Sequence, residues 1–234
     1  MPLMAIGPQA VHRTGDVKKT AATWRMADQL AAKLLSLSHH ARRRLFRPTE
    51  PLYAQAEVSA KFYFVLSGLV QVSIIRADGV EVVLEMMGPN TICGEGAAFD
   101  GLPRFSSAVA VEETHALEFD ASKLDAALSE DPAFAHTLLR ATSLKQRVLA
   151  LRLEHLVSHD PEERILELLN RLSEMFAVEH PGGRMLLTQL THEQIAAMTG
   201  TSRVTVTRTL GRLRERGIIQ NDKGHLILTH GGLE

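Results

Sequence analysis

Cysteine, aromatic residues and long apolar runs are all scarce in this chain. Its 234 residues include one cysteine, Cys93, and aromatic residues make up 5% of the sequence. A single cysteine excludes an internal disulfide, and it also excludes an iron–sulfur cluster held by several thiolates of the same chain. No stretch reaches the roughly 18 consecutive apolar residues of a membrane-spanning helix, so we expect no contact with a membrane.

Signals for export and for enzyme chemistry are missing as well. The N-terminus has no basic segment followed by an apolar core, so we expect a cytoplasmic protein. Neither a nucleophile–base motif nor a phosphate-binding loop is present, and the histidines lack metal-ligand spacing; we therefore expect neither an enzyme nor a metal protein. The net charge is −1. Any affinity for nucleic acid must come from a local concentration of positive charge.

The stretch from Leu187 to Ile219 is typical of two short helices joined by a tight turn. Thr191 and Gln194 have the spacing of a capping box, which predicts the start of the first helix. Gly200 can adopt the left-handed conformation that ends it. A second helix is predicted to run to about Arg216. Its buried stripe consists of Val206, Leu210 and Leu213.

The opposite face of the second helix is short-chained and cationic. Its members are Arg203, Val204, Thr207, Arg208, Gly211 and Arg212. The helix and its end carry five arginines against the single Glu215, whereas a merely solvated amphipathic helix usually mixes its charge signs. We therefore favour a helix that lies in the major groove of DNA over a solvated helix face.

Side-chain chemistry assigns contacts on that face. Arg203 and Arg208 can each form a bidentate hydrogen bond with guanine, and Val204 can contact a thymine methyl group. Thr207 and Arg212 belong to the same DNA-binding face. Phosphate contacts are expected from Ser202, Thr205, Thr188 and Gln189.

An apolar hairpin follows the second helix. Ile218–Ile219 and Leu226–Leu228 are the strand segments, and the turn sequence at positions 221–224 is Asn-Asp-Lys-Gly. Pro161 and the two acids after it predict the start of a further helix that packs on the motif. Helices, turn and hairpin together predict a winged helix-turn-helix domain over residues 160–234.

The segment between Leu52 and Phe119 has a different sequence pattern, which is typical of short strands joined by glycine turns. Val70 and Val72 alternate with polar residues, and Asp78-Gly79 is a strong hairpin signal. Strands at a spacing of roughly ten residues predict an antiparallel β-barrel or jelly roll, which we assign to residues 25–130. Residues 1–24 are expected to be an extension. Residues 24–47 are predicted to form one or two helices. The basic run at 42–44 is expected on a solvated helix face, and a second nucleic-acid-binding patch is the alternative.

A long helix is predicted over residues 131–159. Its apolar residues step by three and four, as in a two-stranded coiled coil. The expected dimer seam is formed by Ala141, Leu144, Val148, Leu151 and His155. Packing of this stripe against the chain's own barrel is the alternative. The fold class is thus α+β, with a barrel, a dimerisation helix and a C-terminal winged helix in that order.

This order resembles the cyclic AMP receptor protein and FNR superfamily of bacterial transcription regulators. The resemblance covers roughly residues 30–230. Its carriers are FYFVLSGLVQVSIIRADGVEVVLEMMGPNTICGEG and GLPRFSSAVA in the barrel, and TGTSRVTVTRTLGRLRERGII in the winged helix. It implies a homodimer that binds a palindromic operator in double-stranded DNA, responds to an effector and contacts RNA polymerase.

The resemblance also implies an effector site between the barrel and the long helix. The residues concerned are Gly94, Glu95, Gly96, Arg104, Phe105, Ser106 and Lys145. Cyclic nucleotide binders of the family hold the ribose with a Gly-Glu pair and the phosphate with an Arg-Ser pair. Here Phe105 follows Arg104, and Leu149 and Ala150 stand where two hydroxyls would reach the purine. A cyclic-nucleotide-responsive regulator is therefore the less favoured alternative.

The segment around Arg104 and the recognition helix are more similar to the cyanobacterial global nitrogen regulator, which senses 2-oxoglutarate. That similarity implies Arg104 and Lys145 as partners of a small anion, and GTA-like half-sites in the operator. It is partial, because Ala150 replaces an acidic residue and Ser106 an aromatic one.

Three alternatives stay open beside this interpretation. Arg104 can instead form a salt bridge with Glu95 or Glu112 inside an empty barrel, which would give an effector-independent regulator. The winged helix can belong to an adaptor that contacts protein. Cys93 can be a haem ligand, although a buried small hydrophobe is favoured because no histidine stands two residues beyond it.

Overall fold

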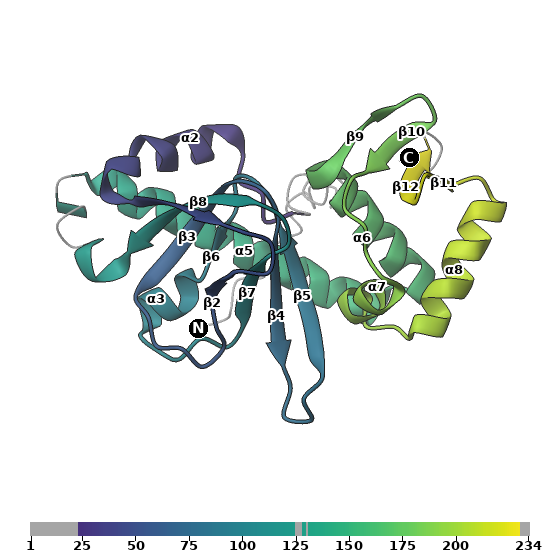
Figure 1. Ribbon diagram of the computed structural model, residues 1–234, viewed down its shortest axis with the longest axis horizontal. Helices are drawn as coiled ribbons and strands as arrows, with labels where there is room; N and C mark the ends of the chain where they lie inside the picture. Colours follow the sequence, from purple (N-terminus) through teal and green to yellow (C-terminus); the bar gives the residue numbers. More distant parts are fainter. Residues whose placement is uncertain (1–22, 125–127, 130, 230–234) are drawn as a thin grey trace, which may run out of the picture.

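The computed structural model describes residues 23–124, 128–129 and 131–229. Figure 1 shows two lobes, a β-roll with its attached helices and a winged-helix lobe, with the long helix α5 (Pro132–Ser158) running behind strands β4 and β5 toward the second lobe. Apart from its last two residues, the expected extension 1–24 lies outside the described residues. No described helix has the length and apolarity needed to cross a membrane.

The β-roll consists of two four-stranded antiparallel sheets, with strand orders β1-β8-β3-β6 and β2-β7-β4-β5. The predicted turn is confirmed, since Gly79 has a φ of 80° between β4 and β5. Val70 and Val72 are buried as expected, but the alternation stops at Ser73, which is 2% exposed and follows a shift of register. The strands are β1 (Arg42–Phe46), β2 (Pro51–Tyr53), β3 (Lys61–Ser67), β4 (Val70–Ile75), β5 (Glu81–Met87), β6 (Ile92–Cys93), β7 (Ser107–Ala110) and β8 (Thr114–Asp120).

Aromatic side chains join the β-roll to the helices that cover it. Phe62 stacks on Phe119 with ring centroids 5.0 Å apart, and Phe119 contacts Phe134 of α5 at 5.8 Å. These rings share one core with the buried face of α2 (Asp28–Ser36). The remaining helical pieces of this lobe are α3 (Glu95–Asp100) and the short turns η1 (Ser38–His40) and η2 (Ala121–Lys123).

The prediction of helix up to residue 47 was wrong in its second half. Residues 42–46 form β1, which pairs with β8 in antiparallel register. The basic run therefore lies on an edge strand, where Arg44 donates to Glu118 over 2.6 Å and Phe46 is buried. A complete ladder of backbone hydrogen bonds outweighs the weak helical periodicity of this segment. Helix α3 was not expected at all.

Helix α5 begins after Asp131, whose carboxylate accepts from the amide of Ala133 over 2.9 Å. Ala141 and Val148 of the expected dimer seam are each 1% exposed within the single chain, and Ala141 belongs to the core that α5 shares with the β-roll. Leu144, Leu151 and His155 are half-buried. A different apolar stripe faces outward. It comprises Leu139, Leu149, Leu153 and Leu156, with Val157 beside it.

The C-terminal lobe is a winged helix, as predicted. Thr191 and Gln194 form the expected capping box, and Gly200 ends α7 in the left-handed conformation. The hairpin joins a four-stranded sheet of order β11-β12-β10-β9, in which β9 had not been expected. The elements are α6 (Pro161–Phe176), β9 (Ala177–His180), β10 (Gly183–Leu186), α7 (His192–Thr199), α8 (Arg203–Glu215), β11 (Ile219–Asp222) and β12 (His225–Thr229).

The two lobes touch through strands β4 and β5. Gln194 at the start of α7 donates to the side chain of Gln71 over 3.1 Å. A Cβ atom on Gly88 would overlap the ring of Phe176 in its present position, so α6 ends in close contact with the β-roll. Helix α8 lies on the side of its lobe that faces away from the β-roll (Figure 1).

Candidate DNA interface and effector cavity

Helix α8 is anchored along one face and exposed along the other. The hydroxyl of Ser202 caps the helix by accepting from the amide of Thr205 over 3.1 Å. The expected buried stripe is confirmed, with each of its side chains at most 1% exposed: Val206, Leu210 and Leu213. Val204, on the opposite face, is 65% exposed. The packing therefore presents the cationic face to solvent, where a DNA groove can reach it.

The arginines of α8 differ in their partners. Arg203 lies 3.2 Å from Glu193 of α7, and Arg212 lies 2.9 Å from Glu162 of α6. Among the described residues, Arg208 is exposed and has no ion pair. Thr207 donates to the Arg203 carbonyl and contacts His192 over 2.8 Å. Arg208 can thus meet a base without first losing a protein partner, whereas Arg203 and Arg212 must exchange one.

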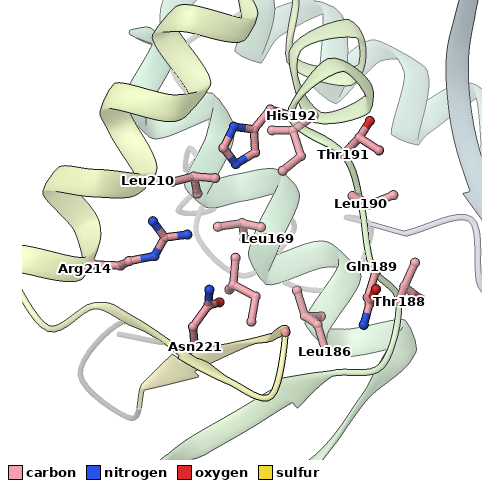
Figure 2. A pocket seen from close by; sticks show the side chains of 13 residues that line it. Leu169, Leu186, Thr188, Gln189, Leu190, Thr191, His192, Leu210, Arg214 and Asn221 are labelled. Carbon is pink, nitrogen blue, oxygen red and sulfur yellow. The ribbon is translucent and has the colours of Figure 1, made fainter.

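The expected phosphate contacts ahead of α7 line a separate hollow in the winged helix. This pocket of about 350 Å³ lies between α6, α7, α8 and the wing, and Thr188 and Gln189 stand on one side of it. Figure 2 shows Arg214 and Asn221 across the hollow from these two residues, and His192 at its upper end. Thr188 is half-buried and Gln189 is exposed, so Gln189 is the more accessible of the two to a DNA phosphate.

The seven residues expected at the effector site all line one cavity between the β-roll and α5. Its volume is about 420 Å³. Gly94, Glu95 and Gly96 come from the start of α3, the segment 104–106 from the loop before β7, and Lys145 from α5. Leu149, the position expected opposite a purine, also lines the cavity, as does Thr142. The lining residues that were not foreseen include Trp24, Tyr53, Phe99 and Arg152.

Arg104 is the most deeply buried cation of this cavity, at 3% exposure. Its guanidinium donates to two backbone carbonyls, those of Gly94 at 3.0 Å and Lys61 at 2.5 Å, and it lies 4.2 Å from the ring centroid of Tyr53. Gly94 has a φ of 81°, and a side chain there would press on the guanidinium. Among the described residues, Arg104 has no carboxylate partner, so the salt bridges with Glu95 or Glu112 considered above are not formed.

Lys145 is paired, unlike Arg104. Its ammonium lies 2.6 Å from Glu95 and donates to the Ile92 carbonyl over 3.0 Å. One oxygen of Glu95, Oε2, is buried and lacks a hydrogen-bond partner among the described residues. Ser106 is 2% exposed, whereas Phe105 is 70% exposed at the cavity edge. The cavity therefore combines one uncompensated cation, one ion pair and a largely apolar wall.

Cys93 lies behind this site and is fully buried. Burial is the main cause that raises the pKa of its thiol to about 12, and the positive charge of Lys145 acts in the opposite direction. The thiol therefore stays protonated at neutral pH, as a small hydrophobe does.

A second ionic group connects the cavity to the DNA-binding lobe. Glu85 of β5 is 1% exposed and forms an ion pair with Arg152 of α5, and Arg171 of α6 lies 3.8 Å away. Burial lowers the pKa of Arg152 well below its ordinary value, and the neighbouring Arg171 adds to this effect. Trp24 stacks over both Arg152 and Lys145, at 4.6 and 4.9 Å. Sequence patterns gave no signal for this cluster, because its members lie far apart in the chain.

Fold and sites together define a two-domain regulator, with an effector-type β-roll joined to a DNA-binding winged helix. The family profiles agree: a cyclic nucleotide-binding domain matches residues 43–131, and a Crp-like helix-turn-helix domain matches residues 163–234. The chain belongs to the CRP/FNR superfamily of transcription regulators, a family without enzymes.

Curated relatives support this assignment. The CRP-like cAMP-activated global transcriptional regulator of Mycobacterium tuberculosis is 31% identical over 178 residues, which cover 76% of this chain and 80% of that protein. The cyclic AMP receptor protein of Thermus thermophilus is 32% identical over 199 residues, covering 85% and 88%. The global nitrogen regulator of a Nostoc species is 29% identical over 180 residues, covering 76% and 81%.

Solved structures show the same fold. TTHA1359, a CRP/FNR-family regulator from Thermus thermophilus, matches with a TM-score of 0.69 and 26% identity, over 82% of this chain and 96% of that one. The c-di-GMP responsive regulator CLP of Xanthomonas campestris matches with a TM-score of 0.71 and 22% identity, over 85% and 99%.

Proposed function

We propose that this chain is a homodimeric transcription regulator that binds a palindromic operator and is gated by a small anion in the β-roll cavity. The observation that carries the DNA part is the exposed face of α8, with Arg208 free of ion pairs among the described residues. One chain supplies one such helix. Two chains related by a twofold axis would present two of them to adjacent major grooves, about 34 Å apart.

The dimer is proposed to form through the outward stripe of α5. Leu149, Leu153 and Leu156 are 52%, 64% and 45% exposed and recur at spacings of four and three residues. This spacing is that of a two-stranded coiled coil, and a monomer in water would leave the stripe uncovered. The proposed interface thus lies on a different face of α5 from the seam expected from the sequence, which contained Ala141 and Val148.

The half-site is proposed to be GTA-like, with TAC about one helical turn away. Arg203 and Arg208 would contact guanines, and Val204 a thymine methyl group. A valine cannot accept a hydrogen bond from cytosine, so the preferred half-site would differ from that of relatives with an acidic residue there. Thr207 and Arg212 complete the face. Ser202, Thr205, Thr188 and Gln189 would hold the phosphates.

The effector is proposed to be a small organic anion whose charged group binds Arg104. A buried guanidinium held only by carbonyl oxygens keeps its positive charge uncompensated, and an anion in the cavity would supply that charge. Gly94, Gly96, Phe105 and Ser106 would shape the space around it.

A dicarboxylate such as 2-oxoglutarate would place its second carboxylate at Lys145, in competition with Glu95. A cyclic nucleotide would place its phosphate at Arg104 without the hydroxyl that usually follows, and would face Leu149 on α5. For this reason we favour the dicarboxylate class. As an activator, the DNA-bound dimer would also contact RNA polymerase.

Thermal unfolding in the presence of candidate effectors tests the gating proposal. With 2-oxoglutarate at a hundred times its dissociation constant, binding to the native state adds about 2.7 kcal/mol and raises the melting temperature. The variant Arg104→Leu should lose this shift, whereas Arg76→Leu, on the exposed β4–β5 hairpin, should keep it.

The other outcomes of this screen distinguish a dicarboxylate effector from a cyclic nucleotide and from the absence of any effector. A shift with cyclic AMP alone would replace the dicarboxylate by a cyclic nucleotide. No shift with either compound or with other small anions would support an effector-independent regulator with an empty barrel.

A further inference from the structure

Three potential metal ligands meet at the junction between α5 and the DNA-binding lobe. Glu154 and His155 stand in the last turns of α5, and His159 is the first residue after it. One ligand atom from each residue lies within 4.8 Å of the others. The imidazole rings of His155 and His159 have centroids 4.5 Å apart, and the Nε2 atom of His155 lies 3.6 Å from Glu154.

The surroundings favour a cation at this point. The Nδ1 atom of His159 is buried and has no hydrogen-bond partner among the described residues, which leaves a polar atom without compensation. The C-terminal end of a helix carries partial negative charge, and α5 ends at Ser158. Arg164 of α6 donates to the Leu156 carbonyl near the end of α5, and no ion pair of Arg164 with Glu154 is found among the described residues.

We propose that Glu154, His155 and His159 form a binding site for a divalent transition-metal ion of the zinc type. Two imidazole nitrogens and one carboxylate suit zinc and its neighbours better than magnesium or calcium, which prefer oxygen ligands alone. Ligand atoms on one zinc ion lie about 3–4 Å apart, so small side-chain rotations would bring these three together. The fourth position would stay open to water.

The site would clamp the hinge between the two lobes. His155 belongs to the helix and His159 to the extended residue that follows it, with φ −111° and ψ 149°. An ion held by both would fix the direction in which the chain leaves α5 and enters α6. All three ligands come from one chain, so the site needs neither the dimer nor an effector.

Titration of tag-free, chelator-stripped protein with ZnCl2 in a calorimeter tests the site. We expect one ion per chain and no heat of binding with MgCl2. His155→Ala and His159→Ala should each weaken zinc binding about tenfold or more, as loss of a ligand does. His180→Ala is the matched control, because His180 also faces a carboxylate, Asp222 at 3.7 Å, but lies outside the cluster.

Hydrogen exchange of the junction amides supplies an independent readout. Zinc should slow exchange over residues 156–161 in the wild-type chain and leave it unchanged in His159→Ala. Absence of zinc binding to the wild-type chain, or wild-type zinc affinity in both histidine variants, would overturn the site. Zinc binding with unchanged exchange at the junction would overturn the clamp. Neither result depends on operator or effector binding.

Discussion

The described arginines of this protein differ in whether they have a carboxylate partner. Arg203, Arg212 and Arg216 each have a carboxylate partner, while Arg104 is held by carbonyl oxygens and Arg208 extends into solvent. An unpaired cation can gain a partner from a ligand without losing one from the protein. Arg104 and Arg208, which have no carboxylate partner among the described residues, are therefore the arginines from which the effector and DNA proposals start.

Arg208→Ala should remove most of the sequence preference of DNA binding. A bidentate contact with guanine contributes roughly 1–3 kcal/mol of discrimination, while phosphate contacts are insensitive to sequence. Fluorescence anisotropy with an operator and a scrambled duplex should show weak, salt-sensitive and nearly equal binding to both. Arg76→Ala is the control and should retain the preference. Retained preference in Arg208→Ala would exclude this residue as a base contact.

The thiol of Cys93 should be inert in the folded protein. Its pKa is raised to about 12 by burial, so the thiolate is scarce at pH 8. Ellman's reagent should label the protein at this pH only after denaturant is added. Rapid labelling of the native chain would show that the thiol is neither buried nor protonated.

At the scale of elements, α5 uses two faces for two tasks. Its Ala141 and Val148 side is buried within the chain, and its Leu149 and Leu153 side is exposed. Spacing in the sequence showed that a coiled-coil-like stripe exists but not which stripe faces out, because both have steps of three and four. Only the position of the β-roll beside the helix decides between them.

Leu153→Asp should dissociate the dimer. A charge in the middle of the proposed coiled-coil stripe would be buried without a partner. Light scattering coupled to size exclusion should give the mass of one chain, instead of two for the wild type. Val58→Asp, at an exposed site of the β-roll, should stay dimeric. A dimeric Leu153→Asp variant would place the interface elsewhere.

Glu85→Gln should destabilise the fold, because it leaves Arg152 and Arg171 buried without a carboxylate. Removing one partner of a buried ionic group costs about 3–5 kcal/mol. Urea unfolding should show this loss, whereas Glu81→Gln, on an exposed part of β5, should change the free energy of unfolding little. Equal stability of both variants would mean that the pair contributes no net stabilisation.

Local signals predicted most elements, and tertiary contacts decided the rest. Capping by Thr191 and the turn at Gly79 depend on neighbouring residues, so the sequence contains them. The basic strand at 42–46 needs β8 as its partner, and β8 lies more than 70 positions away, with Arg44 paired with Ala116 in the register. The resemblance to a known family allowed seven of the cavity residues to be predicted. Trp24 and Arg152 could not be predicted, because they reach the cavity only through the tertiary fold.

For the whole molecule, effector cavity and DNA-binding lobe share one buried ionic cluster. Arg152 lines the cavity, and its partner Glu85 also lies near Arg171 of α6. A ligand that displaces Trp24 or Arg152 would therefore change the contacts that hold α6 against β5. The chain thus contains a DNA-binding lobe and a cavity, and the buried ionic cluster contacts both of them.

Selection of DNA from a random pool by the purified protein tests whether the chain binds DNA as a symmetric dimer. We expect enrichment of an inverted repeat with GTA-like half-sites, their centres about one helical turn apart, bound by two chains per duplex. Enrichment of a single asymmetric site bound by one chain, or no enrichment at all, would contradict this expectation.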